Sequence, residues 1–251
     1  MLVLSRLTSR EKTTGLSRET WNMVVKAIED AIPLYDQVND LISLGKAQEA
    51  RVYAIQHLRL SPKDYVLDGG IGPGTTSRLI LSNFKPALLV GLDESVKQLQ
   101  TAKQNLREFG DNSVNAVRGS FEFLPFRDRT FQSVITCYAL RDSLDISKSV
   151  YEYARVCDSN ASFADVDIGK PDNSLKRLIS EAYVKYLIPL IARMAIRNKM
   201  KGNPWRMIAP TYRSLPTNQT LVDLFKQAFH EIQIKEFLNG GVIVVTGRMQ
   251  P

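Results

Sequence analysis

Hydrophobic positions in the first quarter of the chain recur at helical spacing. They run from Trp21 to Ile28 behind Ser17, a residue type that caps helix N-termini. Pro33 should end this helix, and a second helical stretch covers about 46–58. The first sixteen residues are polar and mixed, so we expect a loose arm there.

From residue 65 onward, short apolar runs alternate with helical stretches. This alternation is typical of a parallel sheet with crossover helices, and continuous apolar runs suit strands that are covered on both faces. The predicted strands are 65–67, 87–92, 115–117, 131–137 and 161–168, and the predicted helices between them are 75–81, 95–109 and 146–156.

The last third interrupts this alternation. Residues 171–201 are mostly helical, with Pro189 expected to kink or split the segment. A helical pattern returns at 221–228, and two strands, about 232–237 and 242–246, flank the turn Asn239-Gly240-Gly241. We therefore predict an α/β, Rossmann-like fold with a seven-stranded, mostly parallel sheet that ends in an antiparallel hairpin. A helical N-terminal extension (1–60) precedes the main domain (61–251), which carries a helical lid at about 171–216.

Composition narrows the class of protein. The chain has 251 residues, 44% hydrophobic and 24% charged, which suits one α/β domain with a small addition. Its two cysteines form no C-x-x-C pair and it has two histidines, which argues against a metal site. Neither a secretory leader nor a membrane span is visible, so we expect a cytoplasmic protein. The net charge of +7 favours an anionic partner or simply serves solubility.

A glycine cluster follows the first predicted strand, in the segment Asp68-Gly69-Gly70-Ile71-Gly72-Pro73-Gly74. Its spacing is GxGxG rather than the GxGxxG of dinucleotide sites, and Pro73 lacks the N–H that a phosphate would use. Nicotinamide and flavin cofactors are therefore disfavoured. The loop instead suits a ligand with an amino-acid group, whose ammonium Asp68 can meet. A tight turn without any ligand is the alternative.

Asp93 ends the second strand, where parallel sheets hold their ligands. A carboxylate at this point can accept hydrogen bonds from both hydroxyls of a ribose. Taken alone, Asp93 would be interpreted as a helix cap; its placement beside the glycine loop favours the ribose.

These elements resemble class I S-adenosylmethionine (SAM) methyltransferases. Five stretches are similar, more specifically, to the C-methyltransferases of ubiquinone and menaquinone biosynthesis, the UbiE family, and together they cover the chain from about residue 35 to its end. They are Tyr35-Asp36-x-x-Asn39-Asp40-x-x-Ser43-x-Gly45, Leu124-Pro125-Phe126-x-Asp128-x-x-Phe131, Ala139-Leu140-Arg141-Asp142 (Gly-Leu-Arg-Asn in the family), Gly169-Lys170-Pro171 and Tyr212-Arg213-x-x-Pro216.

The resemblance implies SAM as cofactor, S-adenosylhomocysteine (SAH) as product, and a set of cofactor-binding residues. The glycine loop would line the methionine end, Asp93 with Glu94 the ribose, and Ser120 and Phe121 the adenine. Cys137 stands where the family has a serine after the fourth strand. The full set is Asp68, Gly69, Gly70, Gly72, Gly74, Asp93, Glu94, Ser120, Phe121 and Cys137.

The chain also departs from the family pattern. Ser120 replaces a carboxylate that accepts from the adenine amine, Gln132 replaces an aspartate, and Trp205-x-Met207 replaces a Tyr-x-Tyr pair in the lid. The lid is where substrate identity should be encoded, so these changes bear on the acceptor more than on the cofactor.

Methylation of a carbon beside a phenol or quinol hydroxyl requires that hydroxyl to be deprotonated or bound to a base. The candidates are Arg141, Asp142, Asp167 and Tyr35. Arg141 matches the family position and would stabilise a phenolate. Alternatively, Arg141 forms a structural ion pair with Asp142 or Asp145, and Asp167 caps the following helix.

The predicted lid is both basic and apolar. Such a helical pair could close over a substrate and rest on an anionic membrane surface, or it could pack into the core with a solvated basic face. Only Asp172 and Glu181 oppose its nine basic residues, which are Lys170, Lys176, Arg177, Lys185, Arg193, Arg197, Lys199, Lys201 and Arg206.

We therefore expect a SAM-dependent methyltransferase that C-methylates a quinol or a related aromatic small molecule or lipid, in the cytoplasm or at the inner membrane surface. The alternatives are O- or N-methylation of another small molecule, methylation of RNA, and a non-catalytic SAM-binding protein. No separate RNA-binding module is visible, so no nucleic-acid partner is expected. The sequence leaves the oligomeric state open.

Overall fold

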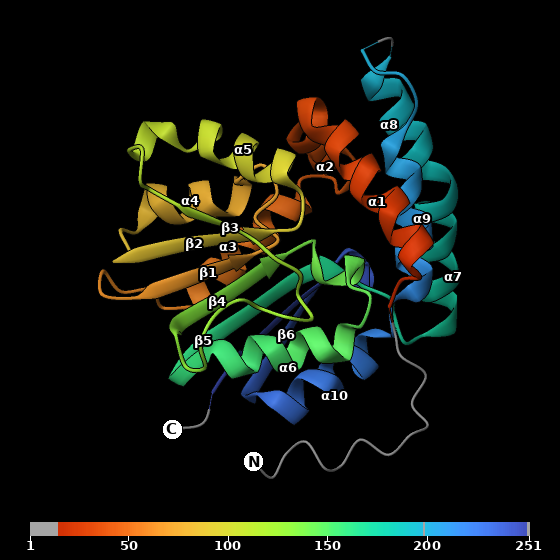
Figure 1. The fold of residues 1–251 in the computed structure, drawn as a ribbon. Coiled ribbons are helices and arrows are strands. Elements are labelled where there is room, and N and C mark those ends of the chain that lie inside the picture. The colour runs from red at the N-terminus through yellow and green to blue at the C-terminus, as the bar shows by residue number, and fades with distance from the viewer. Residues whose placement is uncertain (1–14, 198, 250–251) are drawn as a thin grey trace.

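The computed structural model describes residues 15–197 and 199–249, so the first fourteen residues of the expected N-terminal arm lie outside it. A seven-stranded sheet of order β3-β2-β1-β4-β5-β7-β6 forms the centre of this part of the chain (Figure 1). Strands β1 to β5 run parallel and β7 pairs antiparallel with both β5 and β6. The bounds are β1 Tyr65–Gly69, β2 Leu88–Asp93, β3 Asn115–Arg118, β4 Phe131–Cys137, β5 Cys157–Ile168, β6 His230–Phe237 and β7 Val242–Arg248.

Helices cover both faces of the sheet (Figure 1). Alanines and leucines of α3, α4 and α5 pack against one face, while α6 and α10 pack against the other. Neighbouring residues of β4 divide between the two cores, with Val134 in one and Ile135 in the other, because successive strand side chains point to opposite faces. The bounds are α3 Lys46–His57, α4 Thr75–Asn83, α5 Val96–Asn105, α6 Ile146–Val156 and α10 Asn218–Ala228.

Local chemistry explains the helix starts that the sequence predicted. Ser17 Oγ accepts from the Thr20 N–H at the start of α1 (Arg18–Ala31). Ser95 and Asp145 cap α5 and α6 in the same way. Each cap satisfies one backbone N–H that has no partner inside the helix.

Two features differ from the sequence prediction. β5 begins at Cys157 rather than 161, because Cys157 already pairs with Phe131 across an irregular step in the ladder. Residues 35–42 form a further helix, α2 (Tyr35–Ile42), which directly follows the turn around Pro33. Pro33 therefore ends α1 as predicted, but helical structure resumes after a single turn.

The described part of the lid between β5 and α10 contains the α-helices α7 (Ser174–Ala182), α8 (Ile188–Ile196) and α9 (Ile208–Ser214). A π-helical turn, Tyr183–Leu187, joins α7 to α8 just before Pro189. Proline lacks the N–H that would bond four residues back, so the split falls where the sequence predicted it.

The N-terminal helices pack against this lid. α1 lies beside the short turn Pro204–Met207 and α2 beside α8, as Figure 1 shows. No helix in the described ranges is long and apolar enough to cross a membrane.

Candidate active site

Two cavities open at the carboxyl ends of the parallel strands. The first, of about 80 Å³, lies against the loop after β1, and we call it the glycine-loop cavity. The second, of about 300 Å³, lies between the lid and helices α1 to α3, and we call it the lid cavity. Both are lined by Ile28, Tyr35, Tyr138 and Asp142, so these residues mark the junction between them.

The glycine loop is shaped by backbone conformations that other residues rarely adopt. Gly70 has φ +77° and a Cβ there would lie 2.3 Å from Ala139 Cβ. Gly72 has φ +54°, and a Cβ there would meet only the Gly70 carbonyl, at 3.9 Å. Gly70 is thus required by close packing, whereas Gly72 leaves space in the wall of the cavity for a ligand to approach the backbone.

Asp93 lies at the end of β2 and holds the loop in place. Its Oδ2 accepts from the Gly72 N–H at 3.0 Å and its Oδ1 accepts from the Ser95 N–H at 2.9 Å. Each oxygen keeps a further lone pair for a ligand hydroxyl. Burial raises the pKa of Asp93 to about 6, while the backbone N–H groups of Ser95 and Gly72 oppose that rise.

The predicted cofactor residues divide into two groups. Those that line the glycine-loop cavity are Gly70, Gly72, Asp93, Glu94, Ser120, Phe121 and Cys137. Burial keeps the Cys137 thiol neutral by raising its pKa to about 12.

Asp68, Gly69 and Gly74 lie behind that wall. Asp68 Oδ2 accepts from Ser77 Oγ at 2.6 Å, whereas its buried Oδ1 has no partner. A Cβ on Gly69 would meet the Tyr153 hydroxyl at 2.8 Å, and Gly74 adopts φ +92° at the start of α4. Gly69 and Gly74 therefore shape the turn. The Oδ1 atom of Asp68, at the start of this turn, is an acceptor without a partner.

Arg141 and Asp167, which the sequence singled out separately, form a buried ion pair. The Arg141 Nη1 donates to Asp167 Oδ1 at 2.7 Å and the Arg141 N–H donates to Asp167 Oδ2 at 3.0 Å. The Arg141 Nε also lies 3.6 Å from Asp142 Oδ1. Asp167 therefore holds Arg141 instead of capping the next helix, where Asn173 is the cap. Asp145 caps α6.

Asp142 is the carboxyl group with direct access to both cavities. Burial raises its pKa to about 7, an effect that Arg141 opposes and that Asp167 and Asp93 reinforce. A carboxyl with a pKa near neutrality, at the point where two ligands would meet, can accept and release a proton.

Two tyrosines complete the junction. Tyr35 begins α2, and burial raises the pKa of its phenol. Tyr138 follows β4 with φ +59°, an unusual conformation for an aromatic residue, and its N–H donates to the Val166 carbonyl at 2.6 Å. Tyr138 carries no sequence signal, because a positive φ leaves no mark in the sequence at a residue other than glycine or asparagine.

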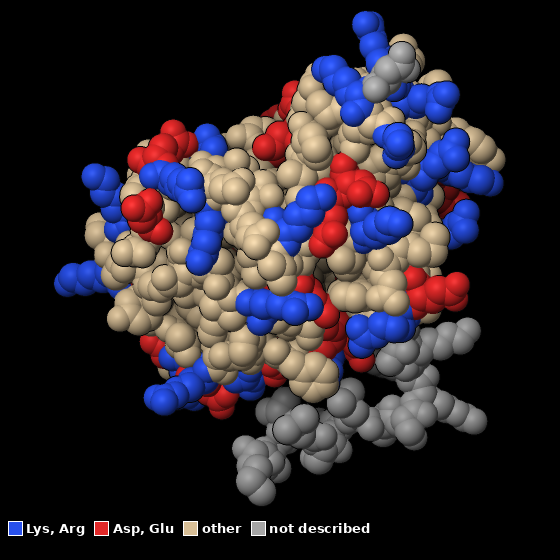
Figure 2. Space-filling view, turned by 45° about the horizontal axis from the view of Figure 1, so that its top comes forward, with Lys and Arg blue, Asp and Glu red and all other residues tan. Residues whose placement is uncertain are grey.

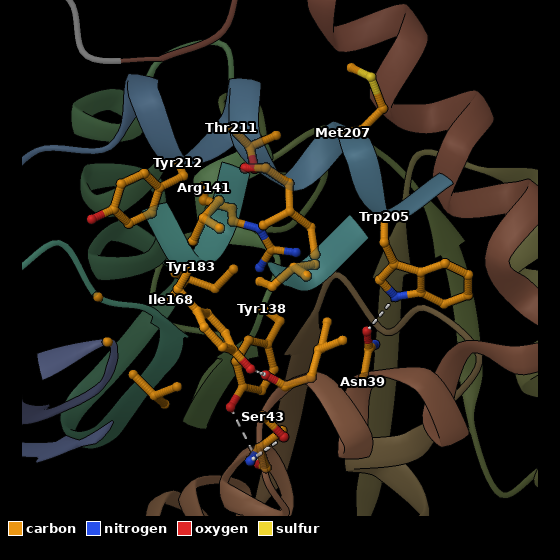
Figure 3. A pocket seen from close by; sticks show the side chains of 18 of the residues that line it. Asn39, Ser43, Tyr138, Arg141, Ile168, Tyr183, Trp205, Met207, Thr211 and Tyr212 are labelled. Atoms are coloured by element: carbon orange, nitrogen blue, oxygen red, sulfur yellow. Dashed lines mark hydrogen bonds between the residues drawn. The ribbon is translucent and has the colours of Figure 1, made fainter. Parts of the chain in front are cut away.

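Side chains of the lid and the N-terminal helices converge on the lid cavity (Figure 3). Trp205 Nε1 donates to Asn39 Oδ1 at 2.9 Å and thereby joins the lid to α2. Tyr183 donates to the Ile42 carbonyl at 2.8 Å. Most of the wall is apolar, and Arg51, Arg141 and Asp142 are its charged members.

The motif that begins at Tyr35 supplies these links. Asp36 accepts from Thr75 Oγ1 at 2.8 Å, Asn39 holds Trp205, and Ser43 Oγ accepts from the Ala47 N–H at the start of α3. The motif thus fixes the N-terminal helices over both cavities.

The residue types around the glycine-loop cavity suit the chemistry of SAM. It combines an open glycine wall, a strand-end carboxylate and an aromatic side chain, Phe121, with an unsatisfied Asp68 oxygen behind it. The fold and the site together define the class of SAM-dependent methyltransferases built on a Rossmann-like sheet.

Comparison with known proteins identifies the family. A sequence model described as "ubiE/COQ5 methyltransferase family" matches residues 16–248. The chain belongs to this family and is a SAM-dependent methyltransferase, as its motifs predicted.

Relatives agree with this assignment, and a solved structure agrees with the fold. The chain is 29% identical to a 2-phytyl-1,4-naphtoquinone methyltransferase of Nostoc sp., over 88% of this chain and 98% of that protein. It is 28% identical to a demethylmenaquinone methyltransferase of Lactiplantibacillus plantarum, over 85% and 90%. Its fold is similar to phosphoethanolamine N-methyltransferase 2 of Haemonchus contortus in complex with SAM, with a TM-score of 0.60, 11% identity, and coverage of 81% and 53%.

Proposed function

We propose that this methyltransferase transfers a methyl group to a ring carbon of a quinol or a related aromatic lipid. The observation that carries the proposal is the mainly apolar lid cavity, which meets the glycine-loop cavity at Tyr35, Tyr138 and Asp142. The similarity to a 2-phytyl-1,4-naphtoquinone methyltransferase and to a demethylmenaquinone methyltransferase supports the same substrate class.

We assign the cofactor to the glycine-loop cavity. Gly70 and Gly72 would border its methionine part, Asp93 and Glu94 its ribose, and Ser120 with Phe121 its adenine. When bound, SAM supplies an electrophilic methyl group on a sulfonium and leaves as SAH. The chain's own contribution is to hold the acceptor carbon in line with that group and to exclude water.

In this proposal Asp142 takes the proton from the acceptor hydroxyl. The hydrogen on the methylated ring carbon then leaves as a proton, which restores the aromatic ring. Its raised pKa suits a general base near neutral pH, and it belongs to both cavities. Arg141 is a positioning residue, because its guanidinium contacts both Asp142 and Asp167 and holds the base toward the junction. Tyr35 borders the same point and orients the ring.

We also propose that the outer face of the lid contacts an anionic membrane surface. Figure 2 shows Lys and Arg side chains gathered around the end of the molecule that α7 and α8 form. Apolar side chains are exposed along the same helices and the turn between them. They are Leu175, Leu178, Ile179, Tyr186, Leu187, Leu190 and Met194.

Exposed apolar residues of the lid cavity support this orientation. Three of the residues that line the cavity, Leu44, Ile179 and Leu238, are also exposed to solvent. An aromatic headgroup could therefore enter past an apolar rim while its isoprenoid tail stays in the bilayer.

A methyl-transfer assay tests the proposed function. Labelled SAM is incubated with a demethylated, prenylated naphthoquinol, and label in the extracted lipid is counted and located by mass spectrometry. We expect a C-methylated product with the wild type and little with Asp142→Asn, while Asp158→Asn, outside both cavities, serves as the matched control. SAH binding without methylation of any quinol would contradict the substrate class but leave the cofactor site standing.

A further inference from the structure

The wall of the lid cavity contains a second arginine, Arg51, which forms no ion pair with any residue that the structure describes. The carboxyl group of Asp68 interacts with its charge only from beyond ion-pair distance. Arg51 lies on the face of α3 that also carries the buried Ala47, Ala50 and Ala54, and only 5% of its surface is exposed. Its Nε is buried and has no hydrogen-bond partner. Among the residues that the structure describes, the guanidinium makes neither a hydrogen bond nor an ion pair.

This environment differs from that of Arg141 in the same cavity. Arg141 has carboxylates of Asp142 and Asp167 beside it, so its charge is balanced within the protein. Arg51 instead lies over the ring of Tyr138, with its Cζ at 4.9 Å from the ring centroid. A π face attracts a cation but does not neutralise it.

A buried, unpaired charge is strongly unfavourable in a protein that has no use for it. The cost is recovered when a ligand brings the opposite charge into the same site. Since Arg51 faces a cavity, the missing partner can arrive from there.

The charge of Arg51 also acts at the junction of the two cavities. After burial, which raises the pKa of both phenols, Arg51 is the strongest opposing influence on Tyr35 and on Tyr138. Its field therefore favours negative charge on an oxygen at this point, where the reacting ring would lie.

We propose that Arg51 is the residue that binds the deprotonated hydroxyl oxygen of the aromatic acceptor. This inference rests on the proposed function, and it assigns proton removal and oxyanion binding to different residues. Asp142 removes the proton, and Arg51 holds the resulting oxyanion with guanidinium N–H donors, so that the electron density remains available to the ring carbon. Arg141, with its two carboxylates, orients Asp142 and leaves the oxyanion to Arg51.

A pair of probes that differ in charge tests this role. Calorimetric titration in the presence of saturating SAH compares 2,4-dinitro-1-naphthol, which is an anion at neutral pH, with neutral 1-naphthol. We expect the wild type to prefer the anion and Arg51→Met to bind it about 10- to 100-fold more weakly, the range for a lost hydrogen bond to a charged group. Affinity for 1-naphthol should change little, and Arg51→Lys should retain part of the preference for the anion.

Arg78→Met is the matched control, because Arg78 is an exposed arginine that pairs with Glu108 away from both cavities. It should bind both probes as the wild type does. Arg51→Gln replaces Arg51→Met if the methionine variant does not fold, as judged by circular dichroism and SAH binding.

The results separate this inference from the proposed function. Equal loss of both probes in the Arg51 variants, or no preference for the anion in a wild type that binds SAH, would overturn the role of Arg51 alone. A wild type that binds no SAH would overturn the proposed function itself.

Discussion

At the scale of single residues, the proposed role of Asp142 predicts how the reaction depends on pH. Its folded-state pKa is raised to about 7, so the carboxyl is protonated below that pH and ionised above it. As the proposed general base, Asp142 would work only when ionised. We therefore expect kcat/KM to rise with pH through about 7 in the wild type.

Asp142→Asn should lower kcat by about 100-fold or more and remove this acidic limb, because an amide cannot accept the proton. The measurement is a pH–rate profile for both enzymes. An unchanged limb in the variant would assign the titration to a different group.

Asp93 supplies a second prediction at the residue scale. Its pKa is raised to about 6, so ribose hydroxyls would meet a carboxylate above that pH and a weaker acceptor below it. SAH should bind more weakly at about pH 5 than at about pH 7.5, and Asp93→Ala should weaken binding by about 10- to 100-fold. Isothermal titration at the two pH values measures both effects. Part of the pH dependence should survive in the variant, because burial also raises the pKa of Asp68 to about 6.

At the scale of single elements, α7 and α8 carry the proposed membrane contact. Leu178 and Met194 are each more than 60% exposed, at 63% and 67%. The double variant Leu178→Glu/Met194→Glu should reduce binding to vesicles of phosphatidylcholine and phosphatidylglycerol by about tenfold or more, because two apolar side chains no longer enter the interface.

Vesicle co-sedimentation measures this binding, with pure phosphatidylcholine vesicles as the uncharged reference. Val96→Glu is the matched control, since Val96 is 47% exposed on α5, away from the lid. Equal binding of the double variant and the control would contradict the proposal that the lid face contacts the membrane.

At the scale of the whole molecule, the N-terminal helices and the lid close one cavity from two sides. Trp205 joins them through its hydrogen bond to Asn39 and is only 4% exposed. Trp205→Ala should destabilise the protein by about 3–5 kcal/mol and raise the KM for the acceptor more than that for SAM. Thermal unfolding and steady-state kinetics measure the two effects. Trp205→Phe, which keeps most of the packing, should lose mainly the hydrogen bond and fall between wild type and alanine.

The sequence by itself determined the order and type of most elements. The spacing of apolar positions along the chain predicts the strands and helices. Neighbouring residues determine where helices begin and end: Ser17, Ser95 and Asp145 cap them, and Pro33 and Pro189 interrupt them. The glycine loop and Asp93 were found for the same reason, because positive φ angles and strand ends have their own residue preferences.

Only the tertiary structure decided how charges pair. Arg141 and Asp167 are 26 residues apart in the chain, and they meet because β4 and β5 are neighbours in the sheet. Arg51 had no sequence signal at all, since it lies on a helical face of alanines. Its role depends on a cavity that segments far apart in the sequence enclose. Charge balance depends on contacts across the fold, which the spacing of residues along the chain does not encode.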